Sequence, residues 1–269
     1  MSDSGRWVSL DAGVPRSIFS LMPLCRDLDL VRPFIAKNIP ATNSVSNLVD
    51  NTFNSSARWV RADNLSDPHA VLCRTHRFTL FADSGRAAAR ILAEVPRNLR
   101  LVFSATPTRL CRLIRTHWRG PDAGRRLWYN HCYLYVLRPG RLVIDRTHRV
   151  SRLRPEDAPL IARAWPYGRS PDRILRRIRS GPGYCIRRKG TPVAWGLTHD
   201  DGSMGFLHVV EHYRHQGMAR TLTTALAERL LRLNVQPFMY IITNNRASLR
   251  LTASMGFSRA GRFSWLGTT

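Results

Sequence analysis

Hydrophobic and polar residues follow two different periods along the second half of the chain. Short runs of β-branched and aromatic residues between turn residues predict strands, and apolar residues three or four positions apart predict helices. The clearest helix carries Leu222, Leu226, Leu230 and Leu233 on one face. The pattern predicts strands at 149–153, 184–187, 192–197, 204–210, 238–243 and 257–266, and helices at 154–165, 170–180, 220–233 and 245–254. This alternation is typical of an α/β fold.

The first half of the chain alternates in the same way. The pattern predicts strands at 57–61, 71–74, 78–81, 99–103 and 127–137, and a helix at 86–95. A further helix is expected to begin at Thr106 as its cap, with Pro107 in its first turn. We expect these elements to form a complete α/β layer of their own.

Charge changes this picture of an ordinary globular chain. There are 42 Lys and Arg residues against 18 Asp and Glu, a formal net charge of +24, and only Lys37 and Lys189 are lysines. Divided after Val143, the two halves carry +11 and +13, so the excess is not confined to a nucleic-acid-binding tail. The charge favours anionic ligands in general, such as phosphates, a nucleotide cofactor, RNA or an acidic membrane.

Hydropathy and cysteine usage restrict the location that we expect. No apolar run reaches the roughly 18 residues of a membrane span, and the first residues lack the apolar stretch of a secretion signal. The five cysteines are scattered without C-x-x-C spacing, which argues against a disulfide framework or a cysteine zinc site. We therefore expect a cytoplasmic protein with no membrane partner, whose cysteines are small core residues.

The segment 207–219 carries the strongest chemical signal. In it, Arg214-x-x-Gly217-x-Ala219 connects a predicted strand to a predicted helix. Unpaired N–H groups and the dipole at a helix N-terminus bind phosphate groups, a small residue at 217 lets the backbone approach them, and arginines add charge. The residues that we expect to bind a cofactor are Val209, Val210, Arg214, His215, Gln216, Gly217, Met218, Ala219 and Arg220.

A second motif follows in the sequence, and together the two resemble a known superfamily. Asn245, Leu251 and the pair Gly256–Phe257 match the C-terminal motif of the GNAT acyl-CoA-dependent N-acyltransferases. The segment 207–219 matches their pyrophosphate loop and the strand before it, and 153–157 matches their first strand-to-helix junction. The resemblance covers roughly 149–269, and it implies that Asn245 binds the pantetheine arm of CoA.

Within this superfamily, the segments 190–195, 201–204 and 212–214 resemble the glycine N-acyltransferase branch. The resemblance implies an α/β GNAT fold with a mixed, mostly antiparallel sheet flanked by helices. It also implies a degenerate N-terminal half at 1–143 and a catalytic half at 144–269. The expected reaction transfers an acyl group, acetyl first among the candidates, from acetyl-CoA or another acyl-CoA to a small-molecule primary amine, an amino acid among the candidate acceptors. The oligomeric state stays open.

The acid and base groups depart from that resemblance. The glutamate that the branch uses as general base falls at Ser203, and the tyrosine that many GNAT enzymes use as general acid falls at Thr252. Two catalytic candidates therefore remain, Ser203 to orient a water or the substrate and His208 to accept a proton near neutral pH. In simple alternation Ser203, Leu207 and Val209 share one face of their strand and His208 lies on the other, unless a bulge intervenes.

Other functions compete for the same residues. His208, Glu211 and His212 spell an H-x-x-E-H zinc motif, but that motif needs a helix and the segment reads as a strand, so no metal is expected. Tyr129, Tyr133 and Tyr135 between arginines suggest either nucleobase platforms or one sheet face. The helix with Arg173, Arg176, Arg177 and Arg179 suggests either recognition of an acidic substrate or a solvated face. The alternative function is an Arg-rich RNA-binding protein on a catalytically degenerate GNAT fold.

Overall fold

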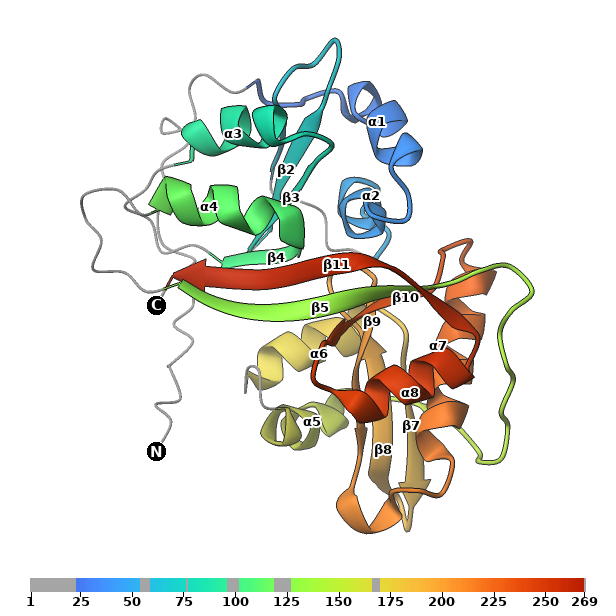
Figure 1. Cartoon of the computed structure of the whole chain (residues 1–269). Coiled ribbons are helices and arrows are strands. Elements are labelled where there is room, and N and C mark those ends of the chain that lie inside the picture. The colour runs from blue at the N-terminus through green and yellow to red at the C-terminus, as the bar shows by residue number, and fades with distance from the viewer. Residues whose placement is uncertain are drawn as a thin grey trace.

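The structure is a computed structural model that describes residues 23–53, 59–75, 77–95, 102–118, 127–165 and 170–268. Its strands form two sheets, one with the order β1-β2-β3-β4-β11-β5-β10 and one with the order β6-β7-β8-β9. Among the strands of the described residues, β3 and β4 pair in parallel and every other pairing is antiparallel. A mixed, mostly antiparallel architecture flanked by helices is therefore confirmed (Figure 1).

Both faces of the N-terminal strands are covered by helices, as the upper part of Figure 1 shows. In β2, Leu72 packs with the core of α3 and α4, while the next residue, Cys73, packs with the core of α1 and α2. This alternation buries apolar side chains on both sides of the sheet. The elements are η2 Leu28–Leu30, α1 Arg32–Lys37, α2 Asn43–Val49, β1 Trp59–Ala62, β2 Ala70–Arg74, β3 Phe78–Ala82, α3 Gly85–Ala93, β4 Val102–Pro107, η3 Thr108–Leu110, α4 Cys111–Trp118 and β5 Leu127–Leu137.

The expected helix start at Thr106 is wrong. Thr106 lies in β4 opposite Ser264 of β11, and helix α4 begins only at Cys111, after a short 3-10 turn. Pairing with β11 extends the strand through Pro107, and a local capping signal cannot report that partner. The predicted strand at 99–103 lies partly outside the described residues, as does 57–61, while the helices before residue 50 were not predicted at all.

The C-terminal elements follow the predicted order closely. The hairpin predicted at 184–197 is confirmed, with Lys189 and Gly190 at φ 47° and 80° in its two-residue turn. Helices α5 and α6 cover one face of the four-stranded sheet, and α7 covers the other. The elements are β6 Ser151–Arg152, η4 Pro155–Asp157, α5 Ala158–Ala164, α6 Pro171–Ser180, β7 Gly183–Arg188, β8 Thr191–Thr198, β9 Met204–Val209, η5 Glu211–Tyr213, α7 Met218–Arg232, β10 Phe238–Ile242, α8 Arg246–Ser254 and β11 Phe257–Thr268.

The two halves of the chain share the seven-stranded sheet. Strand β11 lies between β4 and β5, and β5 lies between β11 and β10, so the long red and green strands cross the middle of Figure 1 side by side. The N-terminal strands therefore do not form a complete layer of their own, contrary to expectation, because the last strand of the chain closes that layer. The division of the chain near residue 143 stays a prediction.

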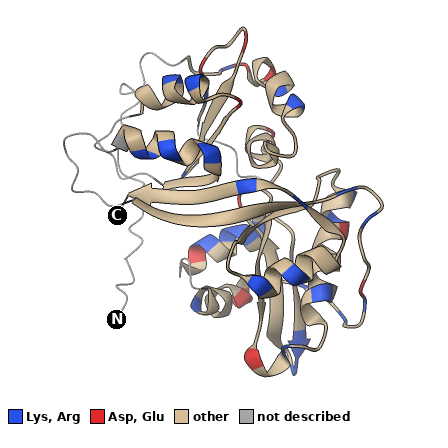
Figure 2. Cartoon of the chain, viewed as in Figure 1, with Lys and Arg blue, Asp and Glu red and all other residues tan. Residues whose placement is uncertain are grey.

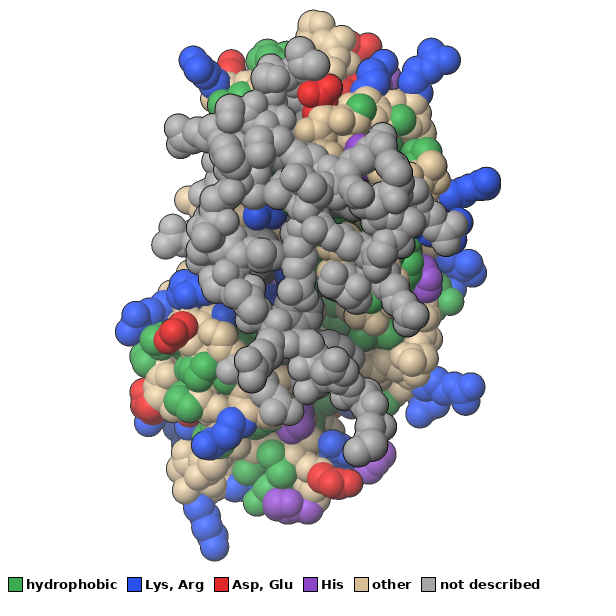
Figure 3. All heavy atoms as spheres, turned by 90° about the vertical axis from the view of Figure 1, so that its left-hand side faces the viewer, with side chains coloured by type: hydrophobic (Ala, Val, Ile, Leu, Met, Phe, Trp, Pro, Cys, Tyr) green, Lys and Arg blue, Asp and Glu red, His purple; other side chains and the backbone are tan. Residues whose placement is uncertain are grey.

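Charge and cysteines are distributed as the sequence suggested. Lys and Arg positions occur along both halves of the chain (Figure 2), and their side chains project from the upper and lower parts of the face drawn in Figure 3. All five cysteines are free thiols, and all are buried, which confirms them as core residues. Among the described residues, no helix combines the length and the apolar character that a membrane crossing needs.

Candidate functional site

The candidate site is built where β9 and β10 diverge. Strand β9 is the last strand of its sheet and pairs only with β8, whereas β10 ends the other sheet beside β5. On the edge of β9 away from β8, backbone N–H and C=O groups are therefore not paired with another described strand. Such an edge can accept an extended ligand as an added strand. Val209 and Val210, which we expect to contact a cofactor, lie at the end of this strand.

A bulge interrupts β9. Phe206 has a left-handed φ of 50°, and the register against β8 shifts between Trp195 and Leu197. As a result, Met204 and Leu207 pack toward α7, while Phe206 packs toward α5 and α6. Simple alternation therefore fails in this strand, and the bulge that would change it is present.

The loop between β9 and α7 has the backbone that an anion site requires. Gly217 caps α7 with φ 81°, a conformation that favours glycine, and a Cβ there would meet only His148, at 3.9 Å. The next residue, Met218, is buried in the core and fixes the start of the helix. Because the first N–H groups of a helix have no carbonyl partner within it, those of Met218 and Ala219 are available to a ligand at this end.

The polar side chains of this loop have different surroundings. Arg214 is half-exposed and donates from Nε to the carbonyl of Val209 at 3.2 Å, so its guanidinium lies beside the open strand edge. His215 and Gln216 are exposed. Arg220 instead points toward α8, with Asp145 at 3.3 Å and Ser254 at 2.9 Å. The structure therefore places Arg214 beside the predicted phosphate position, whereas the Arg220 side chain fastens α7 to its neighbours.

The linker between β5 and β6 reaches the loop, which the sequence analysis missed. His148 approaches the carbonyl oxygen of Gln216 at 2.6 Å, and Arg188 lies 3.4 Å from the other ring nitrogen of His148. Asp145 accepts from the hydroxyl of Thr221 at 2.6 Å. Burial alone would raise the pKa of Asp145, but hydrogen bonds from Thr221, Thr147 and Arg220 lower it. No periodic pattern marks this linker, so only tertiary contacts reveal it.

Strand β10 lies beside β9, and helix α8 follows β10 in the chain. Asn245 follows β10 and caps α8, because its side chain accepts from the N–H of Ser248 at 3.1 Å. It is exposed at the end of the strand, as a pantetheine contact would require. Thr252 is buried in α8, with its hydroxyl 3.3 Å from the sulfur of Met239 in β10. Its short side chain therefore packs between α8 and β10.

Ser203 lies just before β9 and is only 1% exposed. Its hydroxyl donates to the Oδ1 atom of Asp201 at 2.6 Å, and Ser44 of α2 donates to the other carboxylate oxygen at 2.8 Å. A carboxylate is therefore present two residues before 203, on Asp201, and it accepts from both hydroxyls. Its hydrogen bond to Ser44 connects the turn to the N-terminal half.

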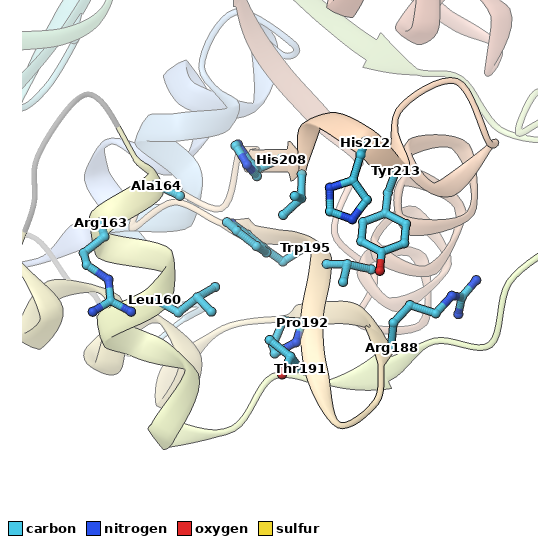
Figure 4. A pocket seen from close by; sticks show the side chains of 12 residues that line it. Leu160, Arg163, Ala164, Arg188, Thr191, Pro192, Trp195, His208, His212 and Tyr213 are labelled. Atoms are coloured by element: carbon cyan, nitrogen blue, oxygen red, sulfur yellow. The ribbon is translucent and has the colours of Figure 1, made fainter.

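His208 occupies the α5 side of the sheet. Its ring stacks on Trp195 with centroids 4.6 Å apart, and both side chains line a hollow of about 540 Å³ between α5 and the ends of β8 and β9 (Figure 4). Burial and then the charge of Arg214 lower its pKa, so the neutral imidazole is favoured near pH 7. The hollow is also lined by His212 and Tyr213, which directly precede the loop 214–219.

The structure also shows the backbone of the H-x-x-E-H segment. His208 lies in a strand and Glu211 in a 3-10 turn, so the H-x-x-E-H segment is not a helix, as predicted. The part of the chain that the structure describes contains no group of three or more His, Cys, Asp or Glu side chains able to hold a metal ion.

The basic helix α6 divides its arginines between two environments. Arg176 and Arg179 are exposed, whereas Arg177 is 1% exposed and contacts Thr198 at 3.1 Å, Ser180 at 3.0 Å and Asp200 at 3.3 Å. Arg173 points into the space between the two halves, where it lines a small cavity. The helix is therefore neither a uniformly solvated face nor a uniform binding surface.

The tyrosines of β5 lie on the sheet rather than on an open platform. The guanidinium of Arg259 covers the ring of Tyr133 at 4.6 Å, and Arg262 lies at 6.0 Å. Tyr129 and Tyr135 pack against two hydrophobic cores. These contacts favour the interpretation of the three tyrosines as part of the sheet.

A family model matches the C-terminal part of the chain. The sequence model of the FR47-like protein family matches residues 182–266. These residues include β9, the loop at the start of α7, β10 and α8.

Solved structures resemble most of the chain. A Drosophila protein is similar with a TM-score of 0.77 and 16% identity, covering 92% of this chain and 98% of that one. A GCN5-related N-acetyltransferase-like protein from Streptococcus suis gives 0.55 and 13% identity, covering 90% and 99%. A GCN5-related N-acetyltransferase from Kribbella flavida gives 0.54 and 15%, covering 86% and 95%. These similarities show that the chain has the GNAT fold.

Proposed function

We propose that this protein is an acyl-CoA-dependent N-acyltransferase that transfers an acyl group, acetyl in the simplest case, to a primary amine. The observation that carries the proposal is the combination of the open β9 edge with the left-handed Gly217 at the start of α7. The edge suits an amide-bearing pantetheine arm, and the helix terminus suits a pyrophosphate. An amine acceptor with a carboxylate, such as an amino acid, is the substrate class that we would test first.

The residues divide between binding and chemistry. Backbone groups of Val209 and Val210 would hold the pantetheine, and the N–H groups of the loop with Arg214 would hold the phosphates. Asn245, between β10 and α8, would hydrogen-bond the pantetheine from the side opposite β9. Attack on the thioester requires the neutral amine, so a group near β9 must remove a proton from the ammonium form. Ser203 and His208 are the candidates that the sequence provides for this step.

Ligand-dependent stability tests the function directly. A ligand that binds only the native state raises the Tm, by an amount that corresponds to about 2.7 kcal/mol at 100 times its Kd. We expect millimolar acetyl-CoA to raise the Tm and desulfo or dephospho analogues to raise it less. Because all cysteines are buried, a thiol reagent can then follow CoA release with amino acids and simple amines as acceptors.

The same experiment discriminates the RNA-binding alternative. Single-stranded RNA is added at the same ionic strength as acetyl-CoA, since phosphate contacts are strongly salt-dependent. A shift with RNA and none with acetyl-CoA would refute the transferase. The Arg259 contact with Tyr133 and the packing of the other tyrosines of β5 lead us to expect the opposite result.

A further inference from the structure

A histidine that the sequence analysis did not single out lies where the two halves meet. His199 is in the turn between β8 and β9, and its ring contacts three aromatic rings from different elements. The centroids of Phe206, Trp165 and Trp265 lie 4.4, 6.4 and 6.3 Å from it. This packing holds the imidazole in one place.

That place is the bulge of β9. A Cβ added at Gly205 would overlap the imidazole at Nε2, so the ring lies directly on the backbone that precedes Phe206. Only glycine at 205 leaves room for this contact. His199 therefore touches the strand at the point where the bulge redirects its side chains, beside the edge proposed to hold the acyl donor.

A small cavity adjoins the ring. It has a volume of about 20 Å³ and is lined by His199, Arg173, Asp200 and residues of the N-terminal half, among them Thr79 and Ser104. The Nδ1 atom of His199 and the Nε atom of Arg173 are both buried and have no hydrogen-bond partner among the described residues. A space of this size holds about one water molecule, which needs two or more polar partners. A water that accepts from Arg173 Nε and donates to His199 Nδ1 satisfies both atoms.

Charged groups surround the ring on every side. Asp200 and Asp201 come from its own turn, Arg173 from α6, and Arg77 from the segment before β3. Burial, together with the charges of the two arginines, lowers the pKa of His199 to about 4 against the opposing effect of the carboxylates. The imidazole is therefore neutral at physiological pH, and the two aspartates are available to stabilise the cation that forms when it gains a proton.

We propose that His199 is the proton acceptor of the reaction, taking the proton of the acceptor's ammonium group through one water molecule in this cavity. This role rests on the proposed acyl transfer. The lone pair freed on nitrogen forms the C–N bond to the thioester carbonyl carbon, the C–S bond breaks, and CoA leaves as thiolate. The thiolate takes up the proton that the amide nitrogen loses, and the proton on His199 passes to solvent.

The pH profile of the reaction tests this role. Acetyl transfer is measured by CoA thiol release from pH 5 to 9, with the fastest acceptor among the common amino acids and simple primary amines. An enzyme with a neutral internal base uses the ammonium form, so kcat/KM should stay level from about pH 5 to the pKa of the amine. Without the base only the free amine reacts, and kcat/KM should rise about tenfold per pH unit over that range.

The variants are His199→Gln and His199→Phe, of which the second keeps an aromatic ring among Trp165, Phe206 and Trp265. Both should lose at least about 10²-fold in kcat/KM at pH 6 and acquire the tenfold slope, with unchanged Kd for acetyl-CoA. His131→Gln, in an exposed position on β5, is the matched control and should behave as wild type.

The outcomes separate this role from the transferase itself. If the wild type binds acetyl-CoA and transfers acetyl, but folded His199 variants keep the level profile, the role of His199 is refuted alone. The same holds if His208→Gln, rather than His199→Gln, acquires the slope. If acetyl-CoA gives no Tm shift and no acceptor releases thiol, the transferase is refuted and His199 with it.

Discussion

The loop before α7 permits a sharp test, because one glycine combines an unusual backbone with open space. Gly217 has φ 81°, and a Cβ there would meet nothing closer than His148 at 3.9 Å. Any other L-residue therefore costs about 1–2 kcal/mol of folding free energy through backbone strain, without a clash. Gly217→Ala and Gly217→Glu should share that cost, so the alanine variant is a matched control for the glutamate variant.

The two variants should differ in CoA affinity. A carboxylate within about 5 Å of a phosphate charge, at an effective dielectric constant near 20, costs about 3 kcal/mol, which corresponds to more than 10²-fold in Kd. We expect Gly217→Glu to lose affinity by at least that factor relative to Gly217→Ala.

Isothermal titration of CoA measures both affinities, and circular dichroism verifies folding. The effect should weaken at high salt, because part of this charge interaction is screened. Equal affinities in two folded variants would exclude the segment 214–219 as the phosphate site.

Three further predictions follow from individual contacts. Gly256 has φ 90°, and a Cβ there would overlap the carbonyl oxygen of Arg141. The variant Gly256→Ala should therefore lose about 2–5 kcal/mol of unfolding free energy, measured by urea denaturation. The control Gly140→Ala should lose about 1 kcal/mol, because Gly140 has φ 71° but open space around it. Equal losses would contradict the contact. His199 stays neutral in the folded protein down to about pH 4 but protonates near pH 6.5 when unfolded. The unfolding free energy should therefore contain about 3 kcal/mol that is present above pH 6.5 and is lost toward pH 4. In His199→Phe this pH dependence of stability should flatten. Metal analysis should find far less than one zinc per chain, and a near-equimolar content would restore the zinc interpretation of His208, Glu211 and His212.

Local sequence determined the elements of the C-terminal half. The leucines of α7 recur at helical spacing, and the hairpin turn at Lys189–Gly190 has the left-handed residues that such turns need. These signals act between residues a few positions apart, so they can be read without knowing the fold. The loop at Gly217 belongs to the same class, because the end of a strand, a glycine and the start of a helix are adjacent in sequence.

Contacts between distant segments decided the rest. Thr106 carries the signal of a helix cap, yet pairing with Ser264 keeps it in a strand, because ladder hydrogen bonds with β11 outweigh a local capping preference. The bulge at Phe206 depends on the register of β9 against β8, and it decides which side chains of β9 face α7. A pattern of period two contains no information about such a shift.

The surroundings of His199 also depend on contacts between segments that are distant in sequence. Its neighbours Arg77, Arg173 and Trp265 come from the first half, from α6 and from the last strand. Nothing in the sequence around residue 199 marks it as more than part of a turn. Its neutral state, its fixed position against Gly205 and its cavity arise because β11 and β5 join the two halves around it. The sequence by itself therefore predicted where a phosphate would bind, whereas the environment of His199 depends on the tertiary structure, because burial and distant charges set its pKa.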